Sequence, residues 1–187
     1  AYTFDLRKYN RYQPITIAAR AYTYMRAGRH ENALYPLFLG YPHLIRGYES
    51  SSFRSSQDER FNFNSLMGTR IAVFNFEVRL PFTGPEKLAV VRSGMLFSDL
   101  NLFFDAGLAW DSNSKVAFRS TPRYVETVQG PVGQSVDVYE RIPALSAGLS
   151  LRVNLFGAMI LEPYYAFPFQ RTDVRFGTFG LNFAPGW

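Results

Sequence analysis

The sequence predicts an all-β fold of antiparallel strands that cross a membrane, and three observations predict it. Apolar and polar residues alternate with a period of two along much of the 187-residue chain, as in strands with one apolar face. Phe, Tyr and Trp make up 17% of the residues, which suits β-structure. Arg outnumbers Lys 17 to 3. Because soluble domains usually cover their surface with Lys and Glu, we expect much of this exterior not to face water.

The clearest alternating segment is 144–156. Its odd positions from Leu145 to Leu155 are all apolar, whereas Ser150 and Arg152 fall on the opposite face. This length suffices to cross a bilayer as a tilted strand. The same alternation predicts seven strands, over residues 4–7, 15–25, 72–82, 99–110, 144–156, 159–167 and 175–183.

Short and long connections alternate between these strands. The connections at 10–14 and at Gly157 are tight turns, whereas 27–69 and 111–143 are long and rich in Ser, Asn, Gly and Pro. Outer-membrane barrels have this asymmetry, with short periplasmic turns and long outside loops. The connection 83–97 is an exception, since it is moderately long on the side expected to be short.

Alternation alone does not say which face of the strands meets lipid. A soluble lipocalin-like binding protein has the same pattern with its apolar face turned inward. Two features favour a transmembrane β-barrel: a polar face of Gly, Ser, Asn and Arg, and aromatic residues near strand ends, as in an interfacial girdle. These aromatic residues are Phe82, Trp110, Phe156, Phe167, Phe169 and Trp187.

Composition and motifs argue against several other classes of protein. No run of 18 apolar residues is present, so we expect no transmembrane helix. No signal peptide is recognisable, and we expect the chain to start after one. The chain has no Cys, and its net charge of +5 is scattered, which argues against disulfides and nucleic acid. His30 and His43 lack the spacing of a metal pair or triad. We therefore expect no enzyme activity, metal or cofactor.

The first long connection contains Arg46-Gly47-Tyr48, and two strands with inward acids, Glu77 and Asp105, follow it. Together with the closing segment 180–187, these features resemble, in order, the BamA-like outer-membrane assembly and two-partner-secretion barrels of the bacterial surface antigen type. The resemblance covers nearly the whole chain, apart from the connection 111–143.

This resemblance implies a barrel of about sixteen strands. Residues 1–187 would form the carboxy-terminal part of one outer-membrane β-barrel domain, and we expect the other strands and any periplasmic domain to lie upstream. In the last strand, Phe179, Leu181, Phe183 and Trp187 would form the terminal signal for insertion. An interfacial anchor is an alternative role for Trp187.

The alternation places Glu77 and Asp105 on the polar faces of neighbouring strands. Two carboxylates there repel each other unless a cation lies between them, and a guanidinium can bond both. The resemblance implies that Arg46 folds back to pair with them, that Gly47 permits the tight backbone, and that Tyr48 is a packing contact. The alternative is that all three charged groups are ordinary solvated residues.

The resemblance also implies a function: the assembly, insertion or translocation of polypeptides at the bacterial outer membrane. The expected partners are outer-membrane lipid, client or partner outer-membrane polypeptides, and periplasmic or surface accessory subunits. The strand at 175–183 would form one side of a seam that accepts client strands. A passive channel, a structural barrel and a subunit of a larger outer-membrane complex are the alternatives.

Overall fold

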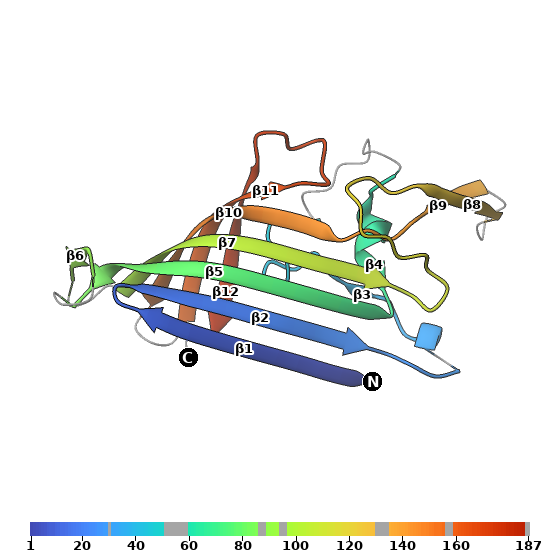
Figure 1. Ribbon diagram of the computed structural model, residues 1–187. Coiled ribbons are helices and arrows are strands. Elements are labelled where there is room, and N and C mark those ends of the chain that lie inside the picture. Colours follow the sequence, from blue (N-terminus) through green and yellow to red (C-terminus); the bar gives the residue numbers. More distant parts are fainter. Residues whose placement is uncertain are drawn as a thin grey trace.

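One curved antiparallel sheet dominates the computed structural model, which describes residues 1–29, 31–50, 60–85, 89–93, 97–129, 135–155 and 159–185 (Figure 1). Seven strands follow one another in the order β1-β2-β5-β7-β10-β11-β12, and the short β6 (Val91–Arg92) pairs in parallel with the end of β5. The seven strands are β1 (Tyr2–Tyr12), β2 (Ile15–Met25), β5 (Arg70–Gly84), β7 (Phe97–Trp110), β10 (Ala144–Leu155), β11 (Met159–Pro168) and β12 (Thr178–Pro185).

The all-β, antiparallel fold class is therefore confirmed, but a closed barrel is not shown. Within the described residues, β1 and β12 are the two edges of the sheet and each pairs on one side only. In the described part of the chain, no helix is long and apolar enough to span a membrane. The barrel of about sixteen strands remains a prediction.

The two faces of the sheet differ as the alternation predicts. On the convex face, Leu149 and its cross-strand partner Leu102 are 53% and 58% exposed. On the concave face, Ser150 and its partner Asn101 are buried. Large exposed apolar residues continue over the convex face at Phe74, Phe76, Leu100, Tyr165, Phe167, Phe179 and Leu181. This is the opposite of a lipocalin-like interior and suits contact with lipid.

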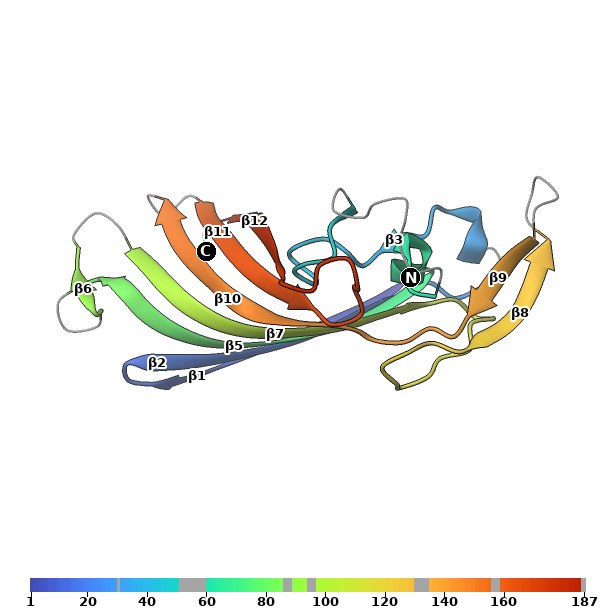
Figure 2. The same ribbon diagram turned by 90° about the horizontal axis from the view of Figure 1, so that it is seen from above.

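The connection between β2 and β5 folds onto the concave face (Figure 2). Its described part contains a short ladder of β3 (Leu37–Phe38) with β4 (Met67–Gly68) and the 3-10 helices Glu31–Ala33 and Phe63–Leu66. Its buried apolar side chains form one core with the inner face of the sheet. This core comprises Leu39, Leu44, Ile45, Tyr48, Phe61, Leu66, Ile71, Val73, Ala109, Ile142 and Ala144.

The two long connections are more structured than the sequence predicts. Besides the β3–β4 ladder, the connection 111–143 contains an antiparallel hairpin of β8 (Tyr124–Gln129) and β9 (Ser135–Tyr139). These strands are short, and no long apolar face distinguishes them from a loop. Their Tyr, Val and Thr residues nevertheless favour the extended backbone.

Several predicted boundaries are wrong. The first strand, predicted over residues 4–7, runs from Tyr2 to Tyr12. Only Gln13 and Pro14 separate β1 from β2, so the turn is shorter than 10–14. β5 runs to Gly84 rather than ending at residue 82, with an irregularity in its pairing with β7 between Pro81 and Thr83. β12 starts at Thr178 rather than at Arg175, because the chain turns at Gly177, whose φ is +86°. The predicted turn at Gly157, the aromatic Phe156, His30 and Trp187 lie outside the described residues.

Candidate functional site

The tip of the connection between β2 and β5 is a single tight turn that presents Arg46 to the concave face. The backbone amides of Leu44 and Ile45 both donate to the carbonyl of Tyr41, at 2.8 and 2.9 Å. Gly47 then has a φ of +91°, a conformation that side chains with a Cβ rarely adopt. The turn thus reverses the chain directly after Arg46 and directs its side chain at the strands.

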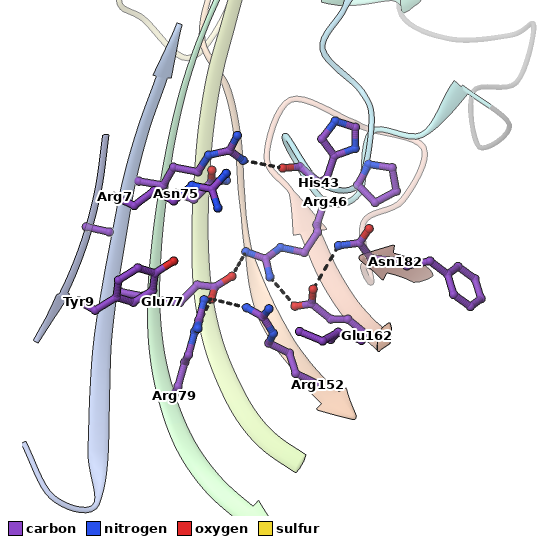
Figure 3. Close-up of a pocket in the computed structure, with 16 residues that line it drawn as sticks. Arg7, Tyr9, His43, Arg46, Asn75, Glu77, Arg79, Arg152, Glu162 and Asn182 are labelled. Atoms are coloured by element: carbon purple, nitrogen blue, oxygen red, sulfur yellow. Dashed lines mark hydrogen bonds and ion pairs between the residues drawn. The ribbon is translucent and has the colours of Figure 1, made fainter. Parts of the chain in front are cut away.

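Arg46 binds three carboxylates that come from three strands. Figure 3 shows two of them, Glu77 and Glu162. Its Nε and Nη2 donate to the two carboxylate oxygens of Asp105 on β7, at 2.8 Å each. Its Nη1 donates to Glu162 on β11 at 2.9 Å, and its Nη2 lies 3.0 Å from Glu77 on β5. The fork on Asp105 is the bidentate geometry that makes guanidinium–carboxylate pairs strong and directional.

Neutral donors satisfy the remaining lone pairs of two of these acids. Asn75 donates to Asp105 at 2.9 Å. Ser150 and Asn182 donate to the two oxygens of Glu162, at 2.7 and 3.2 Å. A buried charge is costly unless it is paired and hydrogen-bonded. These donors therefore help to stabilise the carboxylates on the concave face of the sheet.

Glu77 differs, because two further arginines approach it. Arg79 lies 2.7 Å and Arg152 3.5 Å from the same carboxylate oxygen. Both arginines point at Glu77 from the side opposite Arg46 (Figure 3). Glu77 therefore links the buried cluster around Arg46 to a more accessible group of cations.

An aromatic ring completes the surroundings of Arg46. The guanidinium carbon lies 3.7 Å from the centroid of the Phe103 ring, within the range of a cation–π contact. Arg46 is 3% exposed and Asp105 0% exposed. Removing one partner of so buried a pair leaves an uncompensated charge, which costs roughly 3–5 kcal/mol.

A second set of contacts holds the tip at the connection between β11 and β12. Arg171, which is buried, donates to the carbonyl of Gly47 at 2.9 Å and pairs with Asp173 at 2.7 Å. The Tyr48 hydroxyl lies 2.7 Å from the side-chain oxygen of Gln170 and also donates to a backbone carbonyl on β10. The tip is therefore bound on two sides.

This arrangement lies within a chain whose family can be assigned. A family model described as the Omp85 superfamily domain matches residues 9–186. The chain belongs to the Omp85 superfamily. Comparisons with curated proteins and with solved structures give no significant match.

The Omp85 assignment confirms the resemblance to the BamA-like surface antigen barrels, and it associates the chain with a family of outer-membrane protein translocation and assembly. This family is typically located in the outer membrane and is in general not enzymatic. Within the described residues, no group of three His, Cys, Asp or Glu residues could hold a metal ion. The guanidinium of Arg46 instead occupies the space between the acids.

The structure brings together Arg46, Glu77 and Asp105 of the Omp85 domain, with Gly47 in the turn that the resemblance implies. Tyr48 is fully buried in the loop core and is also a hydrogen-bond donor. The residues of the last strand lie elsewhere: Phe179, Leu181 and Phe183 are 71%, 44% and 59% exposed. Trp187 is outside the described residues.

Glu162, Phe103 and Arg171 are site residues that sequence reasoning did not assign. For Glu162 a signal existed, because alternation places it on the polar face of its strand. Alternation also places Phe103 on the polar face of its strand. Nothing in the sequence, however, indicates that a cation would lie over its ring. The contact from Arg171 to a backbone carbonyl has no signal in the sequence.

Burial shifts the pKa of three other titratable groups of the tip in the direction that favours the uncharged form. Burial lowers the pKa of His43, and the nearby Arg20 guanidinium lowers it further. Burial raises the pKa of the Tyr48 phenol and of the Glu49 carboxyl. The positive charge that the tip carries to the concave face of the sheet is therefore that of Arg46, which stays protonated in proteins.

Proposed function

We propose that this Omp85 domain takes part in assembling, inserting or translocating other polypeptides at the outer membrane, with its loop tip held inside by Arg46. The observation that carries the proposal is one loop arginine bound to carboxylates of β5, β7 and β11. The convex face, with its exposed apolar side chains, would contact outer-membrane lipid as part of an integral barrel.

The contacts suggest what the tip does for such a function. Arg46 joins strands that are not all neighbours, since β10 lies between β7 and β11. Because Arg46 holds β5, β7 and β11 together, this part of the sheet would keep its curvature while an edge strand exchanges one pairing strand for another. β12 is the edge beyond this part of the sheet, and it pairs with β11 alone in the described part of the chain. A client strand could add to such an edge through main-chain hydrogen bonds.

The experiment compares full-length wild-type protein with Arg46→Ala in proteoliposomes. The readout is the folded fraction of an outer-membrane barrel precursor, followed by heat-modifiable gel mobility. We expect Arg46→Ala to remain inserted and to lose most of the assembly activity. Arg46→Lys keeps the charge but not the fork, and should retain only part of the activity. Arg175→Ala, at an exposed arginine of the β11–β12 connection, is the matched control and should behave as wild type.

Two results would count against the proposal. If a folded Arg46→Ala protein assembled the client barrel as well as the wild type does, Arg46 would have no role in assembly. A wild-type protein that accelerates neither assembly nor translocation would remove the function itself, and steady ion conductance in planar bilayers would then favour a passive channel or structural barrel. Co-purification of the wild type with stoichiometric subunits would identify accessory partners of a larger complex.

A further inference from the structure

A cavity lies beside the bound loop tip on the concave face of the sheet. Its volume is about 730 Å³, and five arginines and two glutamates line it. Figure 3 shows Arg79 and Arg152 on one side of Glu77 and Arg46 on the other. The proposed role of Arg46 does not use the other arginines, which are Arg7, Arg20, Arg79 and Arg152.

The accessible charge of this cavity is cationic. The side chains of Arg79 and Arg152 are 21% and 19% exposed. The carboxylate side chains that bind Arg46 are less accessible: Glu77 is 11%, Glu162 6% and Asp105 0% exposed. The guanidinium groups of Arg79 and Arg152 are therefore more accessible from the cavity than the carboxylates that bind Arg46.

The accessible arginines also share their acids. Arg7 and Arg20 both bind Asp5, at 2.9 and 3.0 Å. Arg79 and Arg152 share Glu77 with Arg46, and Arg152 reaches it only at 3.5 Å. That distance is long for a charge-assisted hydrogen bond, which is usually shorter than 3 Å. Arg79 and Arg152 therefore share one carboxylate, Glu77, at this side of the cavity.

We infer that this cavity binds an acidic peptide segment, whose carboxylates pair with Arg79 and Arg152. The inference rests on the proposed function, because polypeptides are then the molecules that reach the cavity. Arginine suits the ligand, since its planar fork bonds carboxylates bidentately. The volume falls in the usual range of ligand sites, about 300–1,000 Å³, and admits several side chains rather than one small anion. The Tyr9 ring, 5.5 Å from the Arg79 guanidinium, adds an aromatic surface beside the charge.

The test uses the full-length protein in lipid nanodiscs and three fluorescent octapeptides: one rich in Asp and Glu, its Asn/Gln counterpart, and a Lys-rich one. Fluorescence anisotropy should show the acidic peptide binding at least about tenfold more tightly than the others, with an affinity that falls as salt is added. Arg79→Gln with Arg152→Gln should abolish most of this preference, whereas the paired Lys variants should keep much of it. Arg175→Gln, at an exposed arginine outside the cavity, should bind as wild type.

Equal binding of the acidic and neutral peptides to the wild type would overturn the inference, as would unchanged binding by a folded Gln double variant. If that double variant does not insert, Arg152→Gln alone decides, because its contact with Glu77 is the longer one. Binding of inorganic phosphate that depends on both arginines, without binding of the acidic peptide, would also overturn it. Client assembly is measured on the same preparations: peptide binding without assembly rejects the proposed function but leaves the cavity site standing.

Discussion

Arg46 and Asp105 face each other in the interior of the Omp85 domain, with two nitrogens of one opposite two oxygens of the other at 2.8 Å. The backbone amide of Arg46 also donates to Asp105, at 3.2 Å. Asp105 therefore fixes both the side chain and the backbone of the loop tip. Because Asp105 is 0% exposed, water cannot replace these bonds without opening the loop.

Replacing Asp105 with Asn should weaken docking of the loop tip by roughly 3–5 kcal/mol, the usual cost of breaking a buried ion pair. Two acids would still face Arg46, so we expect the tip to open more often rather than detach permanently. Hydrogen exchange of residues 41–48 measures this directly. Unchanged protection of those amides in Asp105→Asn would show that the tip is held by other contacts.

Gly107 provides the space in which the loop core packs against β7. A Cβ at this position would lie 2.1 Å from the Cδ1 atom of Ile45, which is fully buried. Gly107→Ala should therefore destabilise loop docking by about 1–3 kcal/mol through overpacking. Ile45→Val removes the clashing methyl group, so the double variant should recover part of the loss. Limited proteolysis of the 27–69 connection measures both effects, and additive losses would contradict the predicted contact.

Arg171 should act as a second anchor for the tip. Arg171→Ala removes the bond to the Gly47 carbonyl, and a hydrogen bond from a charged donor is worth about 1.5–3 kcal/mol. We expect faster hydrogen exchange at the tip, while the sheet itself keeps its protection. Arg175→Ala provides the matched control in the same connection. Loss of protection throughout β11 and β12 would instead indicate a general folding defect.

Acid should loosen the tip through His43. Burial, followed by the Arg20 guanidinium, depresses the pKa of docked His43 below its ordinary value of 6.5. The docked loop thus binds a proton less readily than the released loop, so docking is fully favoured above about pH 6.5 and weakens as the pH falls towards the depressed value. Proteolysis of the 27–69 connection between pH 7.5 and 5.5 should show this trend, and His43→Gln should remove it. A wild type that becomes more resistant on acidification would reverse the predicted sign.

Strand positions and inward faces could be predicted from the sequence because both follow from local alternation. Glu77 and Asp105 illustrate this, since parity alone puts them on one face and chain order puts their strands side by side. Which residues of neighbouring strands lie side by side depends instead on the pairing register of the strands. Glu162 reaches Arg46 only because β11 pairs with β10 in the observed register, with Ser150 opposite Tyr164. Alternation does not contain that information.

The contacts of Arg171 and the β8–β9 hairpin escaped prediction for a different reason. Arg171 donates to a backbone carbonyl 124 residues away in sequence, and any residue type presents such a carbonyl. Short strands such as β8 resemble loops until their partner is known. Local sequence patterns therefore predict the strands of the large sheet of this Omp85 domain better than they predict the connections that fold against the sheet.

Substitutions on the convex face of the sheet should show whether lipid or water covers it. Leu149 is 53% exposed and lies in the middle of β10, between residues that face the cavity side. If lipid covers this face, Leu149→Arg should cost about 2–4 kcal/mol near the midplane of the bilayer. Leu149→Phe should be nearly neutral, since it stays apolar.

On a face covered by water the result would differ, because surface substitutions there usually change stability by less than about 0.5 kcal/mol. Urea unfolding of the full-length protein in lipid bilayers, followed by gel mobility, distinguishes the two cases. The comparison between Arg and Phe at one position removes the effect of side-chain size alone. A tolerated Arg at position 149 would mean that the apolar face of this sheet meets something other than the hydrocarbon of a membrane.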